Sequence, residues 1–179
     1  MDTLRTMTRA RMAVCAAVLL LSASTGARAA QIWSGRTFYF QKANWADWTL
    51  PQNQDRITDL VWITRADAMG IFNIAQQDSY AYDVSPLDTE WATGDAVNWQ
   101  TLTFTTWETW TGIGPPNTVG VNAVVHLVTD DIYIDIRFDS WTQGGGGGVP
   151  AGGGFSYHRA PDPAAVEPTT WTAIKALYR

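Results

Sequence analysis

Apolar and polar residues alternate with a period of two in seven segments of the chain. This period is typical of strands that bury one face, and the segments are rich in the β-branched and aromatic residues that strands favour. Turn-forming residues separate them, and no helical crossover is evident between them. The pattern predicts an all-β fold, an antiparallel β-sandwich of jelly-roll or immunoglobulin-like kind. The expected strands are 37–41, 59–65, 70–76, 98–110, 121–129, 131–141 and 155–159.

The segment 131–141, DIYIDIRFDSW, gives the sharpest prediction of register. The even-numbered side chains from Ile132 to Phe138 are all apolar, while the odd-numbered side chains from Tyr133 to Trp141 are mostly polar or amphipathic. Successive side chains of a strand point to opposite faces. We therefore expect the even face to lie in the core and the odd face to meet solvent, because the opposite register would bury two aspartates and an arginine.

A glycine-rich connection, 144–154, separates the last two expected strands and contains eight glycines in eleven residues. Glycine loses much conformational freedom on ordering, so we expect a mobile hairpin loop. Two interpretations remain open, a slack connector or an adaptable rim over a binding site. Beyond it, residues 161–179 are predicted to form a Pro/Ala linker followed by a short C-terminal helix over 170–179. This helix either docks on the domain or acts as a sorting tail.

The first 29 residues resemble a secretory signal peptide. Arg5, Arg9 and Arg11 precede a short apolar run, small residues follow it, and cleavage is expected after Ala29. A retained membrane anchor is the alternative. The pattern predicts a secreted, extracellular or cell-surface protein whose β-domain spans 30–160. Since Cys15 is the single cysteine, that domain has no thiol and depends on an ordinary hydrophobic core.

Charge narrows the classes of partner. Residues 1–29 carry four arginines and one aspartate, so removing them changes the formal charge from −5 to −8. An acidic surface of this kind repels phosphate backbones and anionic lipid headgroups. We expect no nucleic-acid partner and no membrane span in the mature chain, and we expect an extracellular glycan or a cell-envelope component instead.

Three longer stretches carry a family resemblance. GIFNIAQQDSYAYDVSPLDTEWATG, VVHLVTDDIYIDIRFDSW and GGGFSYHRA together resemble a family of uncharacterised secreted bacterial all-β domains. The ending TTWTAIKALYR is similar to short tails on exported bacterial proteins. The resemblance implies an exported all-β surface protein and assigns no catalytic residues.

Tryptophan is the most unusual component, since all ten lie after residue 29. An exposed indole can stack on a sugar ring while nearby polar side chains bond its hydroxyls. The alternative is that these rings fill a second core. The predicted ligand-binding residues are Trp99, Trp107, Tyr133, Asp135, Arg137, Asp139, Trp141, Tyr157 and His158.

Acidic residues in one turn-rich segment give a calcium prediction, because loop carboxylates suit Ca²⁺. No EF-hand spacing is present, so surface charge for solubility is the competing explanation. No other cofactor is expected. The candidate ligands are Asp78, Asp83, Asp88 and Glu90.

Three functions remain. The preferred one is a binding or adhesion module with a carbohydrate ligand. The second is a structural extracellular protein without a small-molecule site. The third is a glycoside hydrolase, which needs two carboxylates facing each other across a cleft. No residue is predicted to be catalytic.

Overall fold

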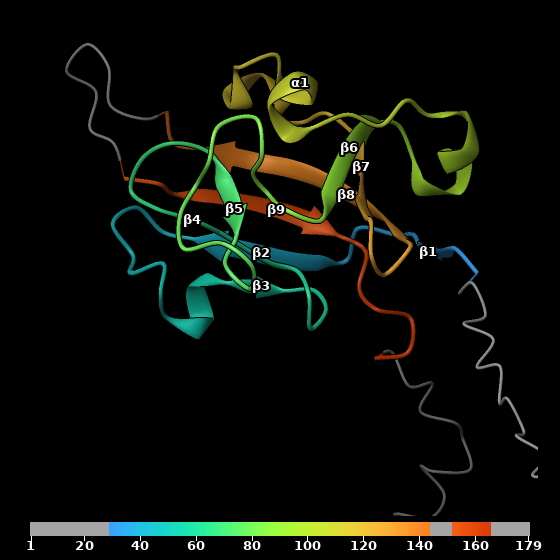
Figure 1. Ribbon diagram of the computed structural model, residues 1–179, viewed down its shortest axis with the longest axis horizontal. Coiled ribbons are helices and arrows are strands. Elements are labelled where there is room, and N and C mark those ends of the chain that lie inside the picture. Colours follow the sequence, from blue (N-terminus) through green and yellow to red (C-terminus); the bar gives the residue numbers. More distant parts are fainter. Residues whose placement is uncertain (1–28, 144–151, 166–179) are drawn as a thin grey trace, which may run out of the picture.

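The computed structural model describes residues 29–143 and 152–165, which form two β-sheets with short helical turns at their margins (Figure 1). The larger sheet has the order β2-β9-β8-β7-β6, and its pairs are antiparallel, while β1 pairs in parallel with the first half of β8. Its strands are β1 (Gln31–Trp33), β2 (Phe38–Lys42), β6 (Thr89–Thr93), β7 (Ala123–Leu127), β8 (Ile132–Trp141) and β9 (Phe155–Arg159).

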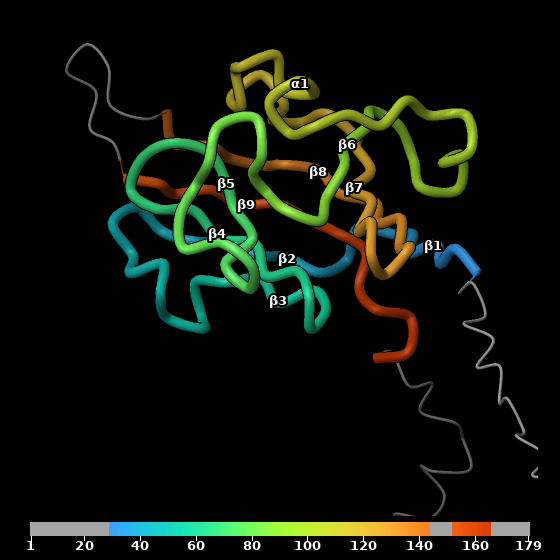
Figure 2. The backbone as a smooth tube through the Cα atoms, viewed as in Figure 1, coloured from blue at the N-terminus to red at the C-terminus, as the bar shows by residue number. Residues whose placement is uncertain are grey.

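The smaller sheet is antiparallel, with the order β3-β4-β5. It comprises β3 (Asp55–Arg56), β4 (Trp62–Arg65) and β5 (Ile71–Asn73). The prediction of a largely antiparallel β protein is confirmed. Figure 2 traces how the two ends of the described chain, β1 with β2 and β8 with β9, meet in one sheet.

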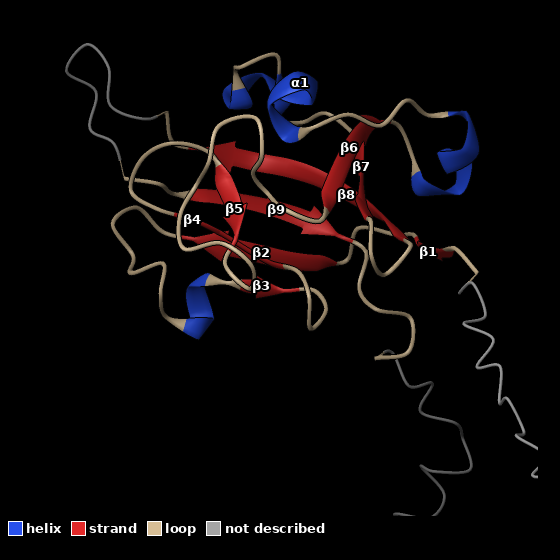
Figure 3. Ribbon diagram, in the orientation of Figure 1, coloured by secondary structure: helices blue, strands red, loops and turns tan. Residues whose placement is uncertain are grey.

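Helical turns replace one of the predicted strands (Figure 3). The expected strand over 98–110 is wrong, because this region holds the 3₁₀ helix η2 (Ala96–Thr101) and the α-helix α1 (Trp107–Thr111). Strand β6 lies in a segment that we expected to be turns. Two further 3₁₀ helices are η1 (Pro51–Asn53) and η3 (Pro115–Thr118), and among the described residues no helix is long and apolar enough to cross a membrane.

One hydrophobic cluster draws on both sheets. It joins Ile63 and Ile71 of the smaller sheet to Phe40, Val125 and Phe138 of the larger one. The even-numbered side chains from Ile132 to Phe138 are all buried in it, as the alternation predicts. The core therefore fixes the register of β8.

The odd face of β8 departs from the prediction at Tyr133, which is buried. The η2 segment lies over this face, and Trp99 stacks on the Tyr133 ring with centroids 4.2 Å apart. His126 of β7 stacks on the same ring at 4.1 Å. The expectation of a solvent-exposed Tyr133 is wrong because a non-local segment covers it.

Asp135 is also buried, contrary to expectation. Its carboxylate accepts hydrogen bonds from the backbone N–H groups of Ala96 (2.7 Å) and Gly35 (3.2 Å). The Arg36 guanidinium lies 3.6 Å from the same carboxylate. Backbone donors and a nearby cation thus offset the cost of burial, which the alternation alone could not reveal.

A β-bulge reverses the expected face of Trp141. The pairing of β8 with β9 shifts register between Phe138 and Ser140, and an extra residue in one strand turns the following side chains to the other face. Trp141 consequently packs against the main core, with its ring 5.9 Å from those of Phe138 and Phe155. Its predicted position on the wet face is wrong.

The end of the glycine connection is tightly packed. Residues 152–154 are buried, and Gly153 has φ +64°, in the left-handed region. A Cβ atom at Gly153 would lie 1.8 Å from the carbonyl oxygen of Ala66. These glycines therefore permit a close backbone approach rather than slack. Residues 144–151 of the predicted loop, 1–28 of the predicted signal peptide and the predicted helix over 170–179 lie outside the described residues.

A buried ion pair links the two sheets. Asp55 of β3 accepts hydrogen bonds from Arg159 of β9, through Nε (2.6 Å) and Nη2 (2.8 Å), and from the Tyr157 hydroxyl (2.6 Å). Burial, followed by the charge of Asp55, raises the pKa of Tyr157 well above its usual value. The carboxylate thus neutralises a buried guanidinium and keeps Tyr157 as a donor.

Replacing Asp55 with alanine should strongly destabilise the protein, by about 3 to 5 kcal/mol, because Arg159 is left buried and unpaired. Urea unfolding measures the change. Asp59→Ala, at an exposed position, is the control and should change stability by less than about 0.5 kcal/mol. Equal effects of the two substitutions would contradict the role given to the pair.

Gly153→Ala and Gly120→Ala separate steric contact from backbone strain. Both glycines have positive φ, but a Cβ at Gly120 would meet nothing within 4 Å. Gly120→Ala should cost about 1 to 2 kcal/mol, the penalty of the left-handed conformation. Gly153→Ala should cost at least about 1 kcal/mol more, since the chain must also shift. Thermal unfolding of both variants tests this, and similar losses would be evidence against the close approach at Ala66.

Candidate functional site

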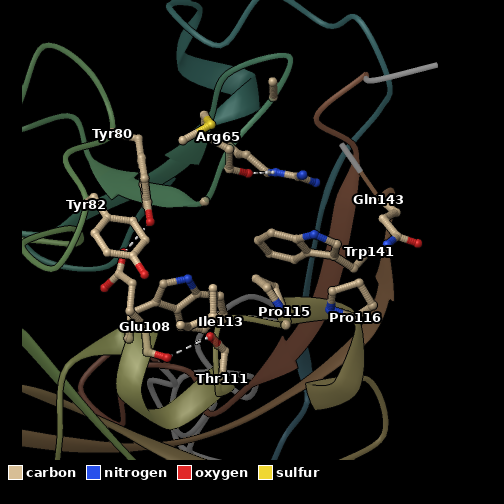
Figure 4. A pocket seen from close by; sticks show the side chains of 15 residues that line it. Arg65, Tyr80, Tyr82, Glu108, Thr111, Ile113, Pro115, Pro116, Trp141 and Gln143 are labelled. Carbon is tan, nitrogen blue, oxygen red and sulfur yellow. Dashed lines mark hydrogen bonds between the residues drawn. The ribbon is translucent and has the colours of Figure 1, made fainter. Parts of the chain in front are cut away.

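A cavity of about 350 Å³ opens between the β4–β5 connection and the segment that carries α1 and η3 (Figure 4). Four aromatic side chains line it, together with two prolines and a small number of polar groups. Figure 4 shows Tyr80, Tyr82 and Glu108 at one end and Trp141 with the prolines at the other. The aromatic and proline residues are Tyr80, Tyr82, Trp107, Trp141, Pro115 and Pro116.

Arg65, the last residue of β4, holds one side of the cavity. Its side chain is only 1% exposed. Nε donates to the carbonyl of Met69 (2.7 Å), and Nη1 donates to those of Thr142 (2.9 Å) and Gly154 (3.1 Å). The guanidinium lies 4.0 Å from the centre of the Trp141 ring. Burial lowers the pKa of Arg65 to about 10, so this cation remains charged at neutral pH.

Glu108 brings a carboxylate to the opposite end. It is 4% exposed, and the Tyr80 hydroxyl donates a short hydrogen bond to its Oε1. Burial raises the pKa of Tyr80, and the bond to Glu108 adds to the rise, so Tyr80 stays protonated as a donor. The second oxygen, Oε2, is closed off from solvent and has no hydrogen-bond partner among the described residues. Glu108 also forms no ion pair with any residue that the structure describes, although Arg65 lines the same cavity.

The local sequence explains how Glu108 reaches the wall. Thr106 caps α1 by accepting from the Thr109 N–H (3.4 Å), and Gly112 ends the helix with φ 60°. Trp107 anchors the helix on the sheet, with its ring 4.8 Å from that of Trp91. Burial of Trp107 in the core leaves the next residue, Glu108, at the edge of the core beside the cavity.

Gly70 lets Tyr80 approach the carboxylate. A Cβ atom at Gly70 would lie 2.4 Å from Cε2 of Tyr80, closer than real contacts allow. The glycine just before β5 therefore makes room for the ring. This close approach brings the Tyr80 hydroxyl to Glu108, which is 28 residues away in sequence.

A second cavity, of about 580 Å³, is more polar. Trp33, Arg56, Asp59, Asp130 and Asp162 are among its lining residues. Trp33 Nε1 and Asp130 Oδ2 have no hydrogen-bond partner within the described ranges. One water molecule can satisfy a neutral donor and an acceptor of this kind. Both cavities thus have an unpartnered carboxylate oxygen, and the first is the stronger candidate because Glu108 is almost completely buried whereas Asp130 is half-buried.

The structure does not bring the predicted ligand-binding residues together. Trp107 and Trp141 line the first cavity. Arg137, Asp139 and His158 form a separate cluster on the outside of the sheet, with His158 Nδ1 2.6 Å from Asp139 Oδ2. Of the remaining four, one belongs to η2 and is partly buried, and the other three are buried. They are Trp99, Tyr133, Asp135 and Tyr157.

The predicted calcium ligands do not meet in one group. Asp78, Asp83 and Glu90 are exposed, while Asp88 accepts hydrogen bonds from the backbone N–H (2.9 Å) and the hydroxyl (2.7 Å) of Thr129. In the part of the chain that the structure describes, no three histidine, cysteine, aspartate or glutamate residues are grouped to hold a metal ion. The structure thus offers no support for calcium at these residues.

The residues of the candidate site that were not predicted from the sequence are Arg65, Tyr80, Tyr82 and Glu108. A capping signal was available, because Thr106 precedes a short run with Glu108 in its first turn and Gly112 after it. That signal predicts a helix, but not a carboxylate inside an aromatic cavity.

Comparison with known proteins gives no further guide: no family model, no curated protein and no solved structure matches this chain. The chemistry of the cavity must therefore be read from its residues. Glu108 is the single carboxylate among its described lining residues. This is one fewer than the pair that glycoside hydrolysis ordinarily uses.

Substituting the two arginines that stack on tryptophans tests the role of Arg65. Arg65→Lys should cost about 2 to 3 kcal/mol, because a lysine cannot reproduce the three hydrogen bonds of the buried fork. Arg56→Lys is the matched control, since Arg56 lies 4.1 Å over the Trp62 ring but is exposed. Its loss should be below about 1 kcal/mol. Chemical denaturation compares the variants, and a harmless Arg65→Lys would contradict the assignment.

Proposed function

We propose that the protein is a secreted or cell-surface binding module that holds a carbohydrate in the cavity beside Glu108. The observation that carries the proposal is the combination of four aromatic walls with a buried carboxylate in one concave site. Ligand sites are usually concave and mostly apolar, with a few polar groups that orient the ligand, and volumes of about 300 to 1,000 Å³ are typical. The cavity falls at the lower end of that range.

Carbohydrate fits this lining for two reasons. The faces of tryptophan and tyrosine rings stack on the apolar faces of sugar rings, which accounts for the aromatic walls. Gln143, which is exposed, can bond hydroxyls at the cavity margin. The secreted or cell-surface location is proposed from the signal-like N-terminus and the family resemblance. We further propose that the two sheets pack as a sandwich.

A structural extracellular role is the second candidate, and the tryptophans favour it. Of the nine tryptophans in the described ranges, Trp33, Trp91 and Trp107 are buried. Trp45, whose side chain is 59% exposed, is the one exposed tryptophan in these ranges. A single exposed indole makes no platform within residues 29–143 and 152–165, so the binding proposal depends on the cavity alone.

Two exposed tyrosines allow the binding proposal to be tested. Tyr82 lines the cavity and is 53% exposed. Tyr39 is similarly exposed, but it lies beside the outer cluster, with its ring centroid 4.9 Å from that of His158. A glycan array, run with and without calcium, identifies a ligand, and calorimetry then measures its affinity. Tyr82→Ala should weaken binding about 3- to 10-fold, the value of one lost ring contact.

Tyr39→Ala is the matched control and should leave the affinity unchanged. The opposite result would move the site to the outer cluster of Arg137, Asp139 and His158. An array without any bound glycan would reject the carbohydrate proposal and favour the structural role. Quenching of tryptophan fluorescence by the ligand should accompany binding, because Trp107 and Trp141 line the cavity.

A further inference from the structure

The unpartnered oxygen of Glu108 says more about the ligand than the aromatic walls do. An ionised carboxylate that leaves water needs a cation or several hydrogen bonds to offset the cost. Glu108 receives one hydrogen bond, from Tyr80, and has no cation within ion-pair distance among the residues described. Buried polar atoms without partners are rare in folded proteins. Oε2 therefore lacks a partner that a ligand could supply.

The surroundings of Glu108 favour a small cation. Tyr80 and Tyr82 lie at the same end of the cavity in Figure 4, and aromatic faces attract ammonium groups. The guanidinium of Arg65 would repel a ligand cation, but it is tied to three carbonyl oxygens and lies over Trp141 at the other end. Arg65 thus forms no ion pair with Glu108 and does not take the position of a ligand ammonium.

The net negative charge of the chain also favours a cationic ligand. Sixteen acidic and eight basic residues follow the expected cleavage site. A net negative field raises the local concentration of cations and speeds their association. A neutral hydroxyl could donate a hydrogen bond to Oε2, but it would not neutralise the buried charge.

Access to Oε2 requires small movements of the cavity wall, because solvent does not reach the atom in this conformation. Three side chains of the wall are well exposed and can turn, namely Met69, Tyr82 and Ile113. Rotamer changes of exposed side chains take place in picoseconds to nanoseconds.

We infer that the preferred ligand of this cavity is an amino sugar with a free ammonium group, which pairs with Glu108 Oε2 while its ring stacks on the aromatic wall. The inference rests on the proposed carbohydrate function and specifies its substrate class. It distinguishes glycans that carry free amines from neutral and N-acetylated ones of the same size. Glu108 acts in this site as the residue that determines specificity.

The test uses calorimetry with the full chain and three β-1,4-linked hexasaccharides: hexaglucosamine, its N-acetylated form and the hexamer of glucose. The measurement is made at about pH 6, where an amino group with a pKa of about 7.7 to 8.0 is protonated. Hexaglucosamine should bind at least about 10-fold more tightly than the other two. This preference should disappear in Glu108→Gln, with the affinity for the glucose hexamer retained.

Asp83→Asn is the control for general charge attraction. Asp83 is an exposed carboxylate whose charge reaches Tyr80, and asparagine tolerates its positive φ of 60°. The preference for the amine should survive this substitution. If Asp83→Asn and Glu108→Gln reduced the preference equally, attraction by the acidic surface would explain it and the inference would be wrong.

A measurement on the unaltered protein covers the case in which Glu108→Gln fails to fold. Raising the pH from about 6 to about 9 neutralises most of the ligand amine, so the preference should fall at least about 5-fold. The pKa of Tyr80 is raised and that of Arg65 is about 10, so neither side chain changes charge appreciably over this interval. A preference that is independent of pH would overturn the inference.

The outcomes separate the two proposals. Equal affinity for all three hexamers would reject the amino-sugar inference and leave the carbohydrate function standing. Failure of all three to bind, with no other glycan retained on the array, would reject both. Tighter binding of hexaglucosamine than of the other two, with loss of that preference in Glu108→Gln, supports both.

Discussion

The buried guanidinium of Arg65 holds together the parts of the chain on which the cavity depends. Its hydrogen bonds join the β4–β5 connection, the residue after β8 and the residue before β9, which are distant in sequence. The same cation lies over Trp141, one wall of the cavity. The Gly154 carbonyl also accepts from the Thr142 N–H (2.9 Å), so Arg65 adds to a backbone contact between the ends of β8 and β9. The Asp55–Arg159 pair plays a corresponding part between β3 and β9, so two buried arginines connect the smaller sheet to the larger one.

Local alternation was sufficient to predict strands and one face of β8, but not what lies over the other face. Ile132 to Phe138 were assigned correctly because apolar side chains of period two have one low-energy register. Tyr133 and Asp135 were not, because the η2 segment, some 35 residues earlier, supplies an aromatic ring and backbone donors. The prediction for Trp141 failed for a different reason. A one-residue bulge reverses the face of the strand on which its side chain lies, and no sequence pattern indicates that bulge. The 98–110 stretch shows the limit of the method, as its threonines and tryptophans suit a strand by propensity but form helical turns.

The candidate site was less predictable than the fold because it is assembled from loops. Two of its walls, Trp107 and Trp141, were in the predicted set, but for an exposed platform rather than for a cavity. Glu108 and Tyr80 come from different segments, and their contact depends on the missing side chain at Gly70. The hydrophobic periodicity of neither segment predicts that contact. A carboxylate buried with one unpartnered oxygen is a property of three-dimensional packing, and it is this property that points to a charged ligand.

The pairing of β1 and β2 with strands near the other end of the described chain has a consequence for folding. β1 pairs with residues 132–134 and β2 with residues 155–159, so about a hundred residues separate the partners. Contacts of such high sequence separation slow folding, because a long loop must close before they form. A nascent chain cannot complete the larger sheet until residue 159 has left the ribosome. The domain must therefore acquire its native topology late, after nearly all of it has been synthesised.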